Sequence, residues 1–351
     1  MEYRTLGNTE LKVSIIGLGM EYLQSNVSRE TVISVVHEAI DHGVNYFDML
    51  ASSPEVKDNF GAAFKGHRND IILAGHLGIA ETNGQYRKSR DYKECEDLFH
   101  DLLKRLDTDH LDVLHLHNID EEDDYQNVIG KNGLYELAGK LKLAGKVRFI
   151  CLSGHSTHIA AQAIKDDVVD VLMHPINIVW DVKGKRELLH LCAAEGVGVV
   201  AMKTYAGGAV FTEKIPVTPL QCIHYSLSQP AVATVVVGVK SNDELKAALR
   251  YLEASADEKS FDQALSIIQK DTQGMCVYCN HCLPCPVGID VGRVNSLVSS
   301  AQYGVTKNLK QEYDALMVKA SDCVECGACE SRCPFRVDVV NRMHKASELF
   351  E

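Results

Sequence analysis

Gly196–Lys203, with the sequence GVGVVAMK, is one of eight short apolar runs that recur along the first 255 residues of the chain. The eight runs are Val13–Leu18, Val44–Asp48, Ile71–His76, Leu111–His117, Val147–Ser153, Val168–His174, Gly196–Lys203 and Ala233–Gly238. Most of them are almost continuously apolar, which is the pattern of strands that are covered on both faces. The recurrence therefore predicts eight buried, parallel β-strands.

Amphipathic stretches separate these predicted strands. Apolar residues recur at helical spacing in Val32–Ile40, Leu98–Leu106, Leu134–Leu141 and Leu245–Leu252. Eight strands that alternate with helices over roughly 250 residues fit an α/β fold of the (β/α)8 or TIM-barrel type. A doubly wound sheet is the alternative, but Gly17–Glu21 (GLGME) is a poor match to its usual GxGxxG turn. We assign residues 1–255 to the barrel.

The overall composition excludes several classes of protein. The chain has 351 residues, of which 46% are hydrophobic and 24% charged, and its formal net charge is −12. Such an acidic chain lacks the basic surface that binds nucleic acid or an anionic membrane. No apolar run approaches the roughly 20 residues that cross a bilayer, and the polar start Met1–Arg4 lacks a signal-peptide core. We expect a cytoplasmic protein with no nucleic-acid or membrane partner.

Eight of the 12 cysteines lie in two tight runs near the C-terminus. The first run is Cys276, Cys279, Cys282 and Cys285, and the second is Cys323, Cys326, Cys329 and Cys333. The second run has the spacing of bacterial ferredoxins, and the first differs by one residue in its last interval. Disulfides belong to small secreted domains, and structural zinc is the alternative for sets of four cysteines. The spacings predict two [4Fe–4S] clusters and therefore single-electron transfer.

Two-cluster ferredoxins usually exchange the last ligand of each run. On that rule, one cluster takes Cys276, Cys279, Cys282 and Cys333, and the other takes Cys323, Cys326, Cys329 and Cys285. Helical patterns at Phe261–Asp271, Ile289–Ala320 and Val337–Leu349 accompany the runs. Residues 256–351 are therefore predicted to form a small α-helical ferredoxin-like domain. The isolated cysteines are interpreted as small buried hydrophobic residues, and they are Cys95, Cys151, Cys192 and Cys222.

Polar residues gather where the predicted strands end, which is the face where (β/α)8 enzymes carry their active sites. They are Asp48, His76, His117, Ser153, His155, His174, Asn177, Lys203 and Tyr205. A single histidine at such a position is usually a hydrogen-bonded structural residue. Several histidines from different strands indicate a functional cavity at the barrel mouth.

Several motifs resemble one enzyme family. Tyr3–Gly19 (YRTLGNTELKVSIIGLG), Gly43–Asp48 (GVNYFD), Leu116–His117 and Gly145–Ile150 (GKVRFI) are similar to the aldo-keto reductases. Ser153–His155 (SGH) and Val200–Lys203 (VAMK) resemble the branch of that family with a C-terminal two-cluster ferredoxin-like extension. The similarity runs from about Tyr3 to Val337. It implies a (β/α)8 oxidoreductase that acts on a small molecule.

The resemblance also implies a catalytic set. The family reduces carbonyls with NADPH through an Asp, a Tyr that is the general acid, a Lys and a His. Asp48 and His117 match the Asp and the His, whereas Ser53 stands in place of the Tyr and His76 in place of the Lys. A serine hydroxyl is a far weaker acid than a phenol, whose pKa is about 10. The predicted catalytic residues are therefore Asp48, His117, His76 and Ser53, and His76 could itself act as the acid.

A barrel cofactor is implied by the same resemblance. The residues expected to hold it are Ser153, His155, Asn177, Lys203, Gly238 and Lys240. Lys240 could meet the 2′-phosphate of NADP(H) as a point charge. The Glu-Asn pair with which the family holds the adenine is replaced here by Ala247 and Ala248. NADP(H) and a flavin are both candidate cofactors.

Four functions fit the sequence. The first is an iron–sulfur oxidoreductase of aldo-keto reductase type with a degraded tetrad, in which the clusters deliver electrons to a small molecule at the barrel mouth. The second is an NADPH-dependent carbonyl reductase with a variant proton donor. The third is a metal-dependent lyase or hydrolase, in which His76, His117, His155 and His174 bind a divalent ion together with Asp48. The fourth is a non-catalytic electron carrier that serves a redox protein partner.

Overall fold

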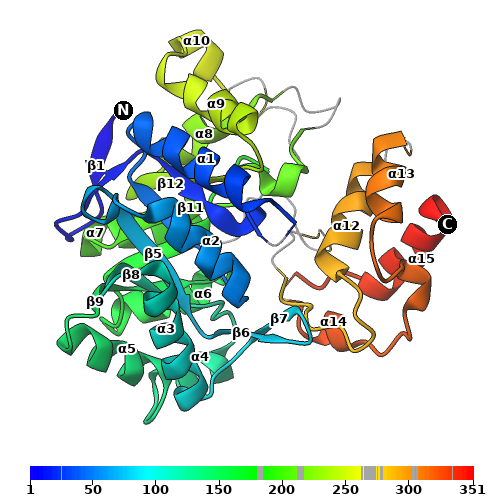
Figure 1. Ribbon diagram of the computed structural model, residues 1–351, viewed down its shortest axis with the longest axis horizontal. Helices are drawn as coiled ribbons and strands as arrows, with labels where there is room; N and C mark the ends of the chain where they lie inside the picture. The colour runs from blue at the N-terminus through cyan, green and yellow to red at the C-terminus, as the bar shows by residue number, and fades with distance from the viewer. Residues whose placement is uncertain are drawn as a thin grey trace.

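The computed structural model describes residues 1–24, 26–179, 185–211, 217–261, 264, 274, 276, 280–301, 305, 307–333 and 335–351. Cys279 and most of the predicted helix at 261–271 lie outside the described residues. Two lobes are visible in Figure 1, a large barrel coloured blue to yellow-green and a smaller helical lobe coloured orange to red.

Eight parallel strands close into a barrel in the order β10-β11-β12-β3-β4-β5-β8-β9. They are β3 (Ile16–Gly19), β4 (Tyr46–Met49), β5 (Ile72–Leu77), β8 (Leu111–Leu116), β9 (Val147–Ser153), β10 (Val171–Pro175), β11 (Gly198–Met202) and β12 (Val232–Gly238). The helices of the barrel lobe are α1 (Arg29–Asp41), α2 (Pro54–Phe64), α3 (Tyr92–Leu106), α4 (Glu122–Ile129), α5 (Leu134–Leu143), α6 (Thr157–Lys165), α7 (Lys185–Glu195), α8 (Pro219–Leu227), α9 (Asn242–Leu249) and α10 (Ala256–Lys259). Short 3₁₀ turns lie at Met20–Tyr22, Arg68–Asp70, Ala206–Gly208 and Arg250–Leu252. The predicted (β/α)8 fold is confirmed.

One predicted strand boundary needs correction. The run Val13–Leu18 spans two elements, because Val13 lies in β2 (Lys12–Ser14), which pairs antiparallel with β1 (Tyr3–Thr5). The Ser14 hydroxyl donates to the Ile16 carbonyl at 2.7 Å, so the chain turns there and the barrel strand begins only at Ile16. At the other end, α10 packs on α8, and the Gln221 side chain donates to the Ser260 carbonyl at 2.5 Å. Residues just past 255 thus contact the barrel lobe, and the domain boundary at residue 255 stays a prediction.

A hairpin that was not predicted is inserted between β5 and α3. It consists of β6 (Ile79–Thr82) and β7 (Gln85–Lys88), joined by Asn83 and Gly84, whose φ angles are 52° and 77°. Asn-Gly is the dipeptide that tolerates two positive φ angles in a tight hairpin turn. The hairpin extends from the barrel toward α14 (Ala328–Ser331) in the other lobe (Figure 1). It also lies close to that lobe, because a Cβ placed on Gly288 would lie 3.8 Å from the Gln85 amide nitrogen.

The smaller lobe is helical, as predicted. Its helices are α12 (Val291–Ser300), α13 (Lys307–Asp314), α14 and α15 (Val339–Phe350), with a 3₁₀ turn at Ala320–Asp322. Its apolar core, which includes Val294 and Met343, continues into barrel residues such as Ile178 and Val179. The two lobes therefore share an apolar interface. Among the described residues, no helix is both long and apolar enough to cross a membrane.

Candidate functional site

A chain of four hydrogen-bonded side chains occupies the barrel mouth. His76 on β5 lies between Asp48 on β4 and His117 at the end of β8. Its Nε2 atom is 2.9 Å from Asp48 Oδ1, and its Nδ1 atom is 2.9 Å from His117 Nδ1. The other nitrogen of His117, Nε2, is 2.6 Å from the hydroxyl oxygen of Tyr86 on β7. Sequence reasoning predicted three of these residues and missed Tyr86, because the hairpin that carries it was not predicted.

One set of tautomers satisfies all three hydrogen bonds. An ionised carboxylate only accepts, so Asp48 accepts from the Nε2–H of His76. A neutral His76 can then accept at Nδ1 from the Nδ1–H of His117. The free lone pair of His117 Nε2 in turn accepts from the Tyr86 hydroxyl. The three hydrogen bonds therefore all run in one direction. When both histidines are neutral, the hydroxyl proton of Tyr86 points at His117.

Burial and charge support this protonation state. Burial by itself would raise the pKa of Asp48, but His76 and His115 hold it well below the usual carboxyl range. Burial lowers the pKa of His117 well below its usual value, and the positive charge of Arg90 lowers it further. Asp48 is thus ionised and His117 neutral at neutral pH.

His115 forms the floor of the site. Its ring stacks on His76 with the centroids 4.4 Å apart, and its Nε2 atom is 3.3 Å from Asp48 Oδ1. Burial lowers its pKa, so this ring is also neutral. His115 was missed in the sequence, although residues two apart on a strand point to the same face. The presence of His117 at the interior face therefore could have indicated it.

Arg90 holds the backbone beneath the Tyr86 hydroxyl. Its Nη2 atom donates to the carbonyls of His117 and Asn118 at 2.9 and 3.2 Å. Its guanidinium also forms a two-pronged ion pair with Asp124 on α4, with both N–O distances 2.7 Å. The Asn118 amide donates to the Tyr86 oxygen at 3.4 Å. The hydroxyl is thus positioned by residues from both β7 and the β8–α4 loop.

A second polar cluster joins the barrel to the helical lobe. Asp120, after β8, pairs through Oδ2 with His281 Nε2 and lies 3.1 Å from His155 Nδ1. The other carboxylate oxygen accepts from the backbone N–H groups of His155 and Ser156. The rings of His155 and His281 meet edge-on, with centroids 4.9 Å apart. His281 immediately precedes Cys282, so the first cysteine run is anchored on the barrel.

The histidines of the metal hypothesis do not gather around one carboxylate. Asp48, His76 and His115 form one group with three possible ligand atoms, and Asp120, His155 and His281 form another. No group of this kind within the described part of the chain combines His76 with His155 or contains His174. Hydrogen bonds within the protein already engage His76, His117 and His155. The four histidines of that alternative therefore do not form one ligand set with Asp48, which lies instead within reach of a common ion with His76 and His115.

Two other predicted residues have structural partners. Ser53 is the N-cap of α2, and its hydroxyl oxygen accepts from the Val56 N–H at 3.3 Å. This contact gives Ser53 a structural role as a helix cap, and its catalytic role stays a prediction. The Asn177 amide donates to the Lys203 carbonyl at 3.0 Å and accepts from the Val179 N–H at 3.2 Å. It therefore ties the ends of β10 and β11 together.

The predicted nucleotide segment is partly filled by the protein itself. The Glu244 carboxylate accepts from the backbone N–H of Lys240 at 2.7 Å, where a phosphate would need the same donor. Tyr22 packs on Gly238 so closely that a Cβ there would lie 2.5 Å from the ring. The Lys240 ammonium lies 5.7 Å from the centroid of the same ring. An anionic 2′-phosphate would have to displace or repel Glu244.

The described cysteines fit iron–sulfur ligation. Cys276 and Cys282 of the first run line one cavity together with Cys333 of the second run. Val337 and Val339 form part of its apolar wall. Thiolate ligands from both runs around one apolar cavity suit a cluster of the ferredoxin type. Cys95, Cys151, Cys192 and Cys222 are buried in the barrel lobe, as predicted.

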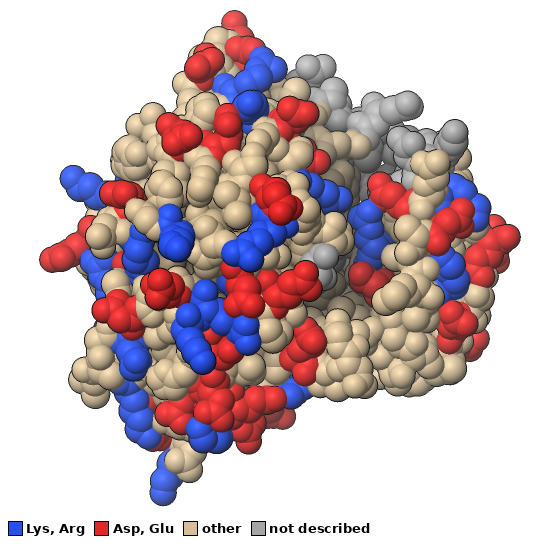
Figure 2. Space-filling view, viewed as in Figure 1, with Lys and Arg blue, Asp and Glu red and all other residues tan. Residues whose placement is uncertain are grey.

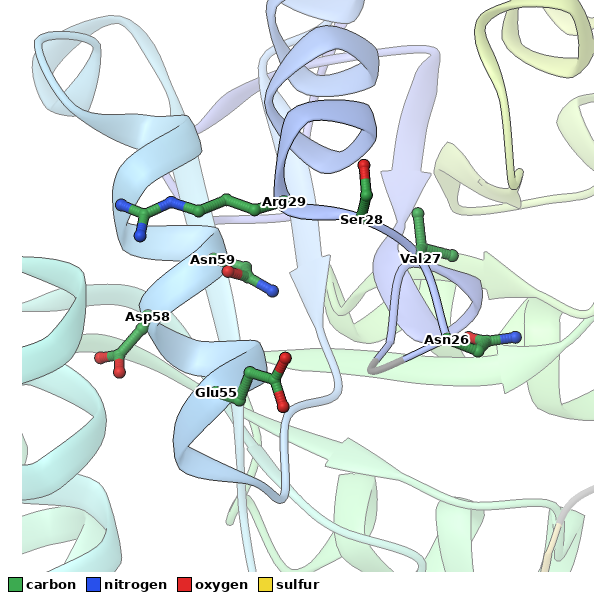
Figure 3. Close-up of a pocket in the computed structure, with 7 residues that line it drawn as sticks. All are labelled: Asn26, Val27, Ser28, Arg29, Glu55, Asp58 and Asn59. Atoms are coloured by element: carbon green, nitrogen blue, oxygen red, sulfur yellow. The ribbon is translucent and has the colours of Figure 1, made fainter. Parts of the chain in front are cut away.

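A separate hollow lies outside the site. It is lined by Asn26, Val27, Ser28, Arg29, Glu55, Asp58 and Asn59, at the N-terminal ends of α1 and α2 (Figure 3). None of these residues belongs to the two histidine clusters. The hollow is open and polar, and we assign it no role in the chemistry.

His174 on β10 provides a test of the buried histidines. Burial lowers its pKa to about 3. His174 is therefore neutral in the folded protein, whereas in the unfolded chain it gains a proton below its usual pKa of about 6.5. Because protonation then favours the unfolded state, this residue lowers the free energy of unfolding by about 2 kcal/mol between pH 7 and pH 5.

Between pH 7 and pH 5, the free energy of unfolding should fall by about 2 kcal/mol less in the His174→Leu variant than in the parent protein. Urea unfolding at the two pH values measures the difference. His158→Leu is the control, because His158 is 80% exposed and should not change the pH dependence. Identical pH dependence in all three proteins would contradict the burial of a neutral His174.

Comparisons with known proteins match both lobes. The model of the aldo/keto reductase family matches residues 15–221, which is more than half of the chain. The model of a 4Fe-4S dicluster domain matches residues 275–338. An L-galactose dehydrogenase of Arabidopsis thaliana is 26% identical and covers 77% of this chain and 95% of its own. The uncharacterized oxidoreductase YqkF of Bacillus subtilis is 24% identical and covers 78% and 97%.

A solved structure agrees with these sequence matches. The holo form of the aldo-keto reductase AKR11C1 from Bacillus halodurans superposes with a TM-score of 0.66 at 25% identity. The match covers 78% of this chain and 99% of that one. The unmatched part of this chain is therefore an addition to a complete barrel enzyme.

Proposed function

Because the chain belongs to the aldo/keto reductase family and carries a 4Fe-4S dicluster domain, we propose that its C-terminal clusters deliver electrons to a small molecule at the barrel mouth. Bound clusters would supply one-electron chemistry. The residues that would hold them are Cys276, Cys279, Cys282 and Cys333 for one, and Cys323, Cys326, Cys329 and Cys285 for the other.

His281 is the observation that carries this proposal. It belongs to the first cysteine run, yet its side chain is paired with Asp120 and packed against His155 in the barrel. Both Asp120 and His281 are nearly inaccessible to solvent, so the pair is a desolvated contact and not a surface ion pair. An accessory domain with an unrelated task would not require its cysteine run to be fixed at the barrel mouth.

The barrel residues have distinct roles in this proposal. Asp48 fixes His76, His76 fixes His117, and the substrate binds beside them. Figure 2 shows a hollow between the two lobes on the face that it presents. On the face shown, positive and negative side chains are intermixed around it, which favours no strongly charged substrate. A flavin is not part of the proposal, since no feature of the described residues favours one.

A second candidate is an NADPH-dependent carbonyl reductase with a variant proton donor. Tyr86 favours it, because a phenol does lie 2.6 Å from the family's histidine position, His117. The contact between Glu244 and the Lys240 N–H disfavours tight binding of a 2′-phosphate. We therefore rank it below electron delivery by the clusters.

Disrupting the contact between the lobes should slow cluster-dependent turnover. We expect anaerobically purified protein to reduce activated aldehydes or quinones with reduced methyl viologen as the donor. His281→Leu leaves Asp120 buried without this partner, which costs on the order of 2–5 kcal/mol, so the rate should fall at least roughly tenfold at unchanged iron content. Stopped-flow oxidation of the viologen measures the rate.

His344→Leu is the matched control. His344 lies on α15 in the same lobe and pairs with Glu325 at 3.2 Å, but both side chains are more than half exposed. An exposed pair contributes little, so this variant should keep the parent rate. The proposal fails if protein with full iron content reduces no probe with the viologen donor.

A further inference from the structure

We infer that Tyr86 is the proton donor to the substrate and that His76 reloads it through His117. The inference rests on the proposed function, because it names the group that protonates the reduced molecule. It also assigns to this hairpin tyrosine the acid that the sequence lacks at Ser53. The geometry that carries it is the unbroken series of hydrogen bonds Asp48–His76–His117–Tyr86.

The direction of these hydrogen bonds reverses when one proton is added. In the neutral chain, the Tyr86 hydroxyl donates to His117 and is turned away from a substrate. A proton taken up at Nδ1 of His76 is stabilised by the adjacent Asp48 carboxylate. His76 then donates to Nδ1 of His117, so the neutral His117 must carry its own proton on Nε2. That Nε2–H donates to the Tyr86 oxygen, and the hydroxyl proton of Tyr86 is released to point at the substrate.

The transfer step balances from this loaded state. The Tyr86 O–H bond breaks and a new O–H bond forms on the oxygen of the reduced substrate. As it does so, the Nε2 proton of His117 moves to Tyr86, and the Nδ1 proton of His76 moves to His117. The hydrogen bonds then have their original direction again, with both histidines neutral and Asp48 ionised. For a carbonyl, two electrons and a second proton from water complete the alcohol, and the electrons come from two molecules of a one-electron donor.

The place of Tyr86 couples this step to the helical lobe. Tyr86 follows Gln85, which lies against Gly288 in that lobe. The tip of the same hairpin therefore touches the electron-carrying lobe, while the next residue reaches the barrel histidines. Docking of the lobe positions the proton donor as well as the cysteine run.

Other titratable and charged groups surround His76 and His117. His115 on β8 stacks on His76, and Arg90, Lys88 and His281 all lie close enough to His117 to disfavour positive charge there. These groups disfavour a proton on His117, whereas His76 lies beside the Asp48 carboxylate.

The test removes the hydroxyl of Tyr86 and keeps its aromatic ring. Tyr86→Phe should lower the rate of probe reduction by roughly 10²-fold or more, within the range that positioned proton transfer supplies. The residual rate should no longer depend on pH as the parent rate does. Tyr92→Phe is the control, since that hydroxyl contacts only Lys140 on the surface at 3.0 Å in the described hydrogen bonds. Rates are measured with reduced methyl viologen and, separately, with NADPH.

A second readout does not depend on turnover. In ¹⁵N spectra of histidine-labelled protein, His117 should appear as the Nδ1–H tautomer, and Tyr86→Phe should shift its Nε2 resonance. Equal rates in parent and Tyr86→Phe, or unchanged His117 resonances, would overturn the role of Tyr86 and leave the proposed function standing. Turnover with NADPH but not with the viologen would overturn the proposed function. The ratio of the parent rate to the Tyr86→Phe rate with NADPH would still test the role of Tyr86. No turnover with either donor would overturn both.

Discussion

Replacing Cys333 by alanine should remove the same cluster as replacing Cys282, although the two cysteines belong to different runs. The reason is that both line one cavity together with Cys276. Replacing Cys326 should remove the other cluster. Each single variant should fall from roughly eight to roughly four iron atoms per chain. We also expect each to lose nearly all viologen-driven turnover, because electrons must pass both clusters to reach the barrel.

Double variants separate crossed from uncrossed ligation. Cys282→Ala with Cys333→Ala should lose no more iron than either single change, whereas Cys282→Ala with Cys326→Ala should lose both clusters. Iron analysis and the electron paramagnetic resonance of dithionite-reduced protein give the two measurements. Cys192→Ala, in the barrel core, is the control and should retain the full signal. If instead the double variant Cys326→Ala with Cys333→Ala loses no more iron than either single change, each run holds its own cluster.

The barrel was predictable because its strands are buried on both faces. Runs such as Ala233–Gly238 must be almost entirely apolar when helices cover one side and the barrel interior the other, so the pattern survives in a single sequence. The cysteine runs were predictable for a different reason. Ligand spacing is imposed by the cluster and not by the fold, and it can be seen without any structure.

The proton donor was not predictable in the same way. Tyr86 reaches His117 from an inserted hairpin, and nothing in its local sequence distinguishes it from a surface tyrosine. The Asn83–Gly84 dipeptide was the available signal, since it marks a tight hairpin turn. Even so, the direction in which β6 and β7 leave the barrel depends on contacts with residues far along the chain, such as Gly288.

The interface between the lobes was hidden for a related reason. His281 stands among cysteines whose spacing already explains the run, so its own partner could not be inferred. Asp120 and His155 come from different strand ends, and only the closed barrel brings them together. Long-range polar contacts of this kind leave no periodic trace in a sequence.

Asp48→Asn should lower the rate of reduction by about 10²–10⁴-fold, which is the contribution of positioned proton transfer. The amide has the size of the carboxylate and can still accept from His76, but it carries no charge. It therefore cannot stabilise the proton that must reside on His76 before Tyr86 donates. Because His76 and His115 favour the ionised form of Asp48 in the folded protein, this carboxylate adds stability above the usual carboxyl pKa and loses it in strong acid. Viologen-driven rates across pH 5–9 measure the effect.

Ser53→Ala is the sharpest comparison, because sequence alone places both Ser53 and Asp48 among the candidate catalytic residues. The hydroxyl of Ser53 accepts from the Val56 N–H at the start of α2, so its loss should cost about 1 kcal/mol of folding free energy. The rate per folded molecule should stay at the parent value. Asp48→Asn should show the opposite pattern, with a large loss of rate. If Ser53→Ala slows reduction as much as Asp48→Asn does, the acid is at the position of the family tyrosine after all, and the hydrogen-bonded chain to Tyr86 is only structural.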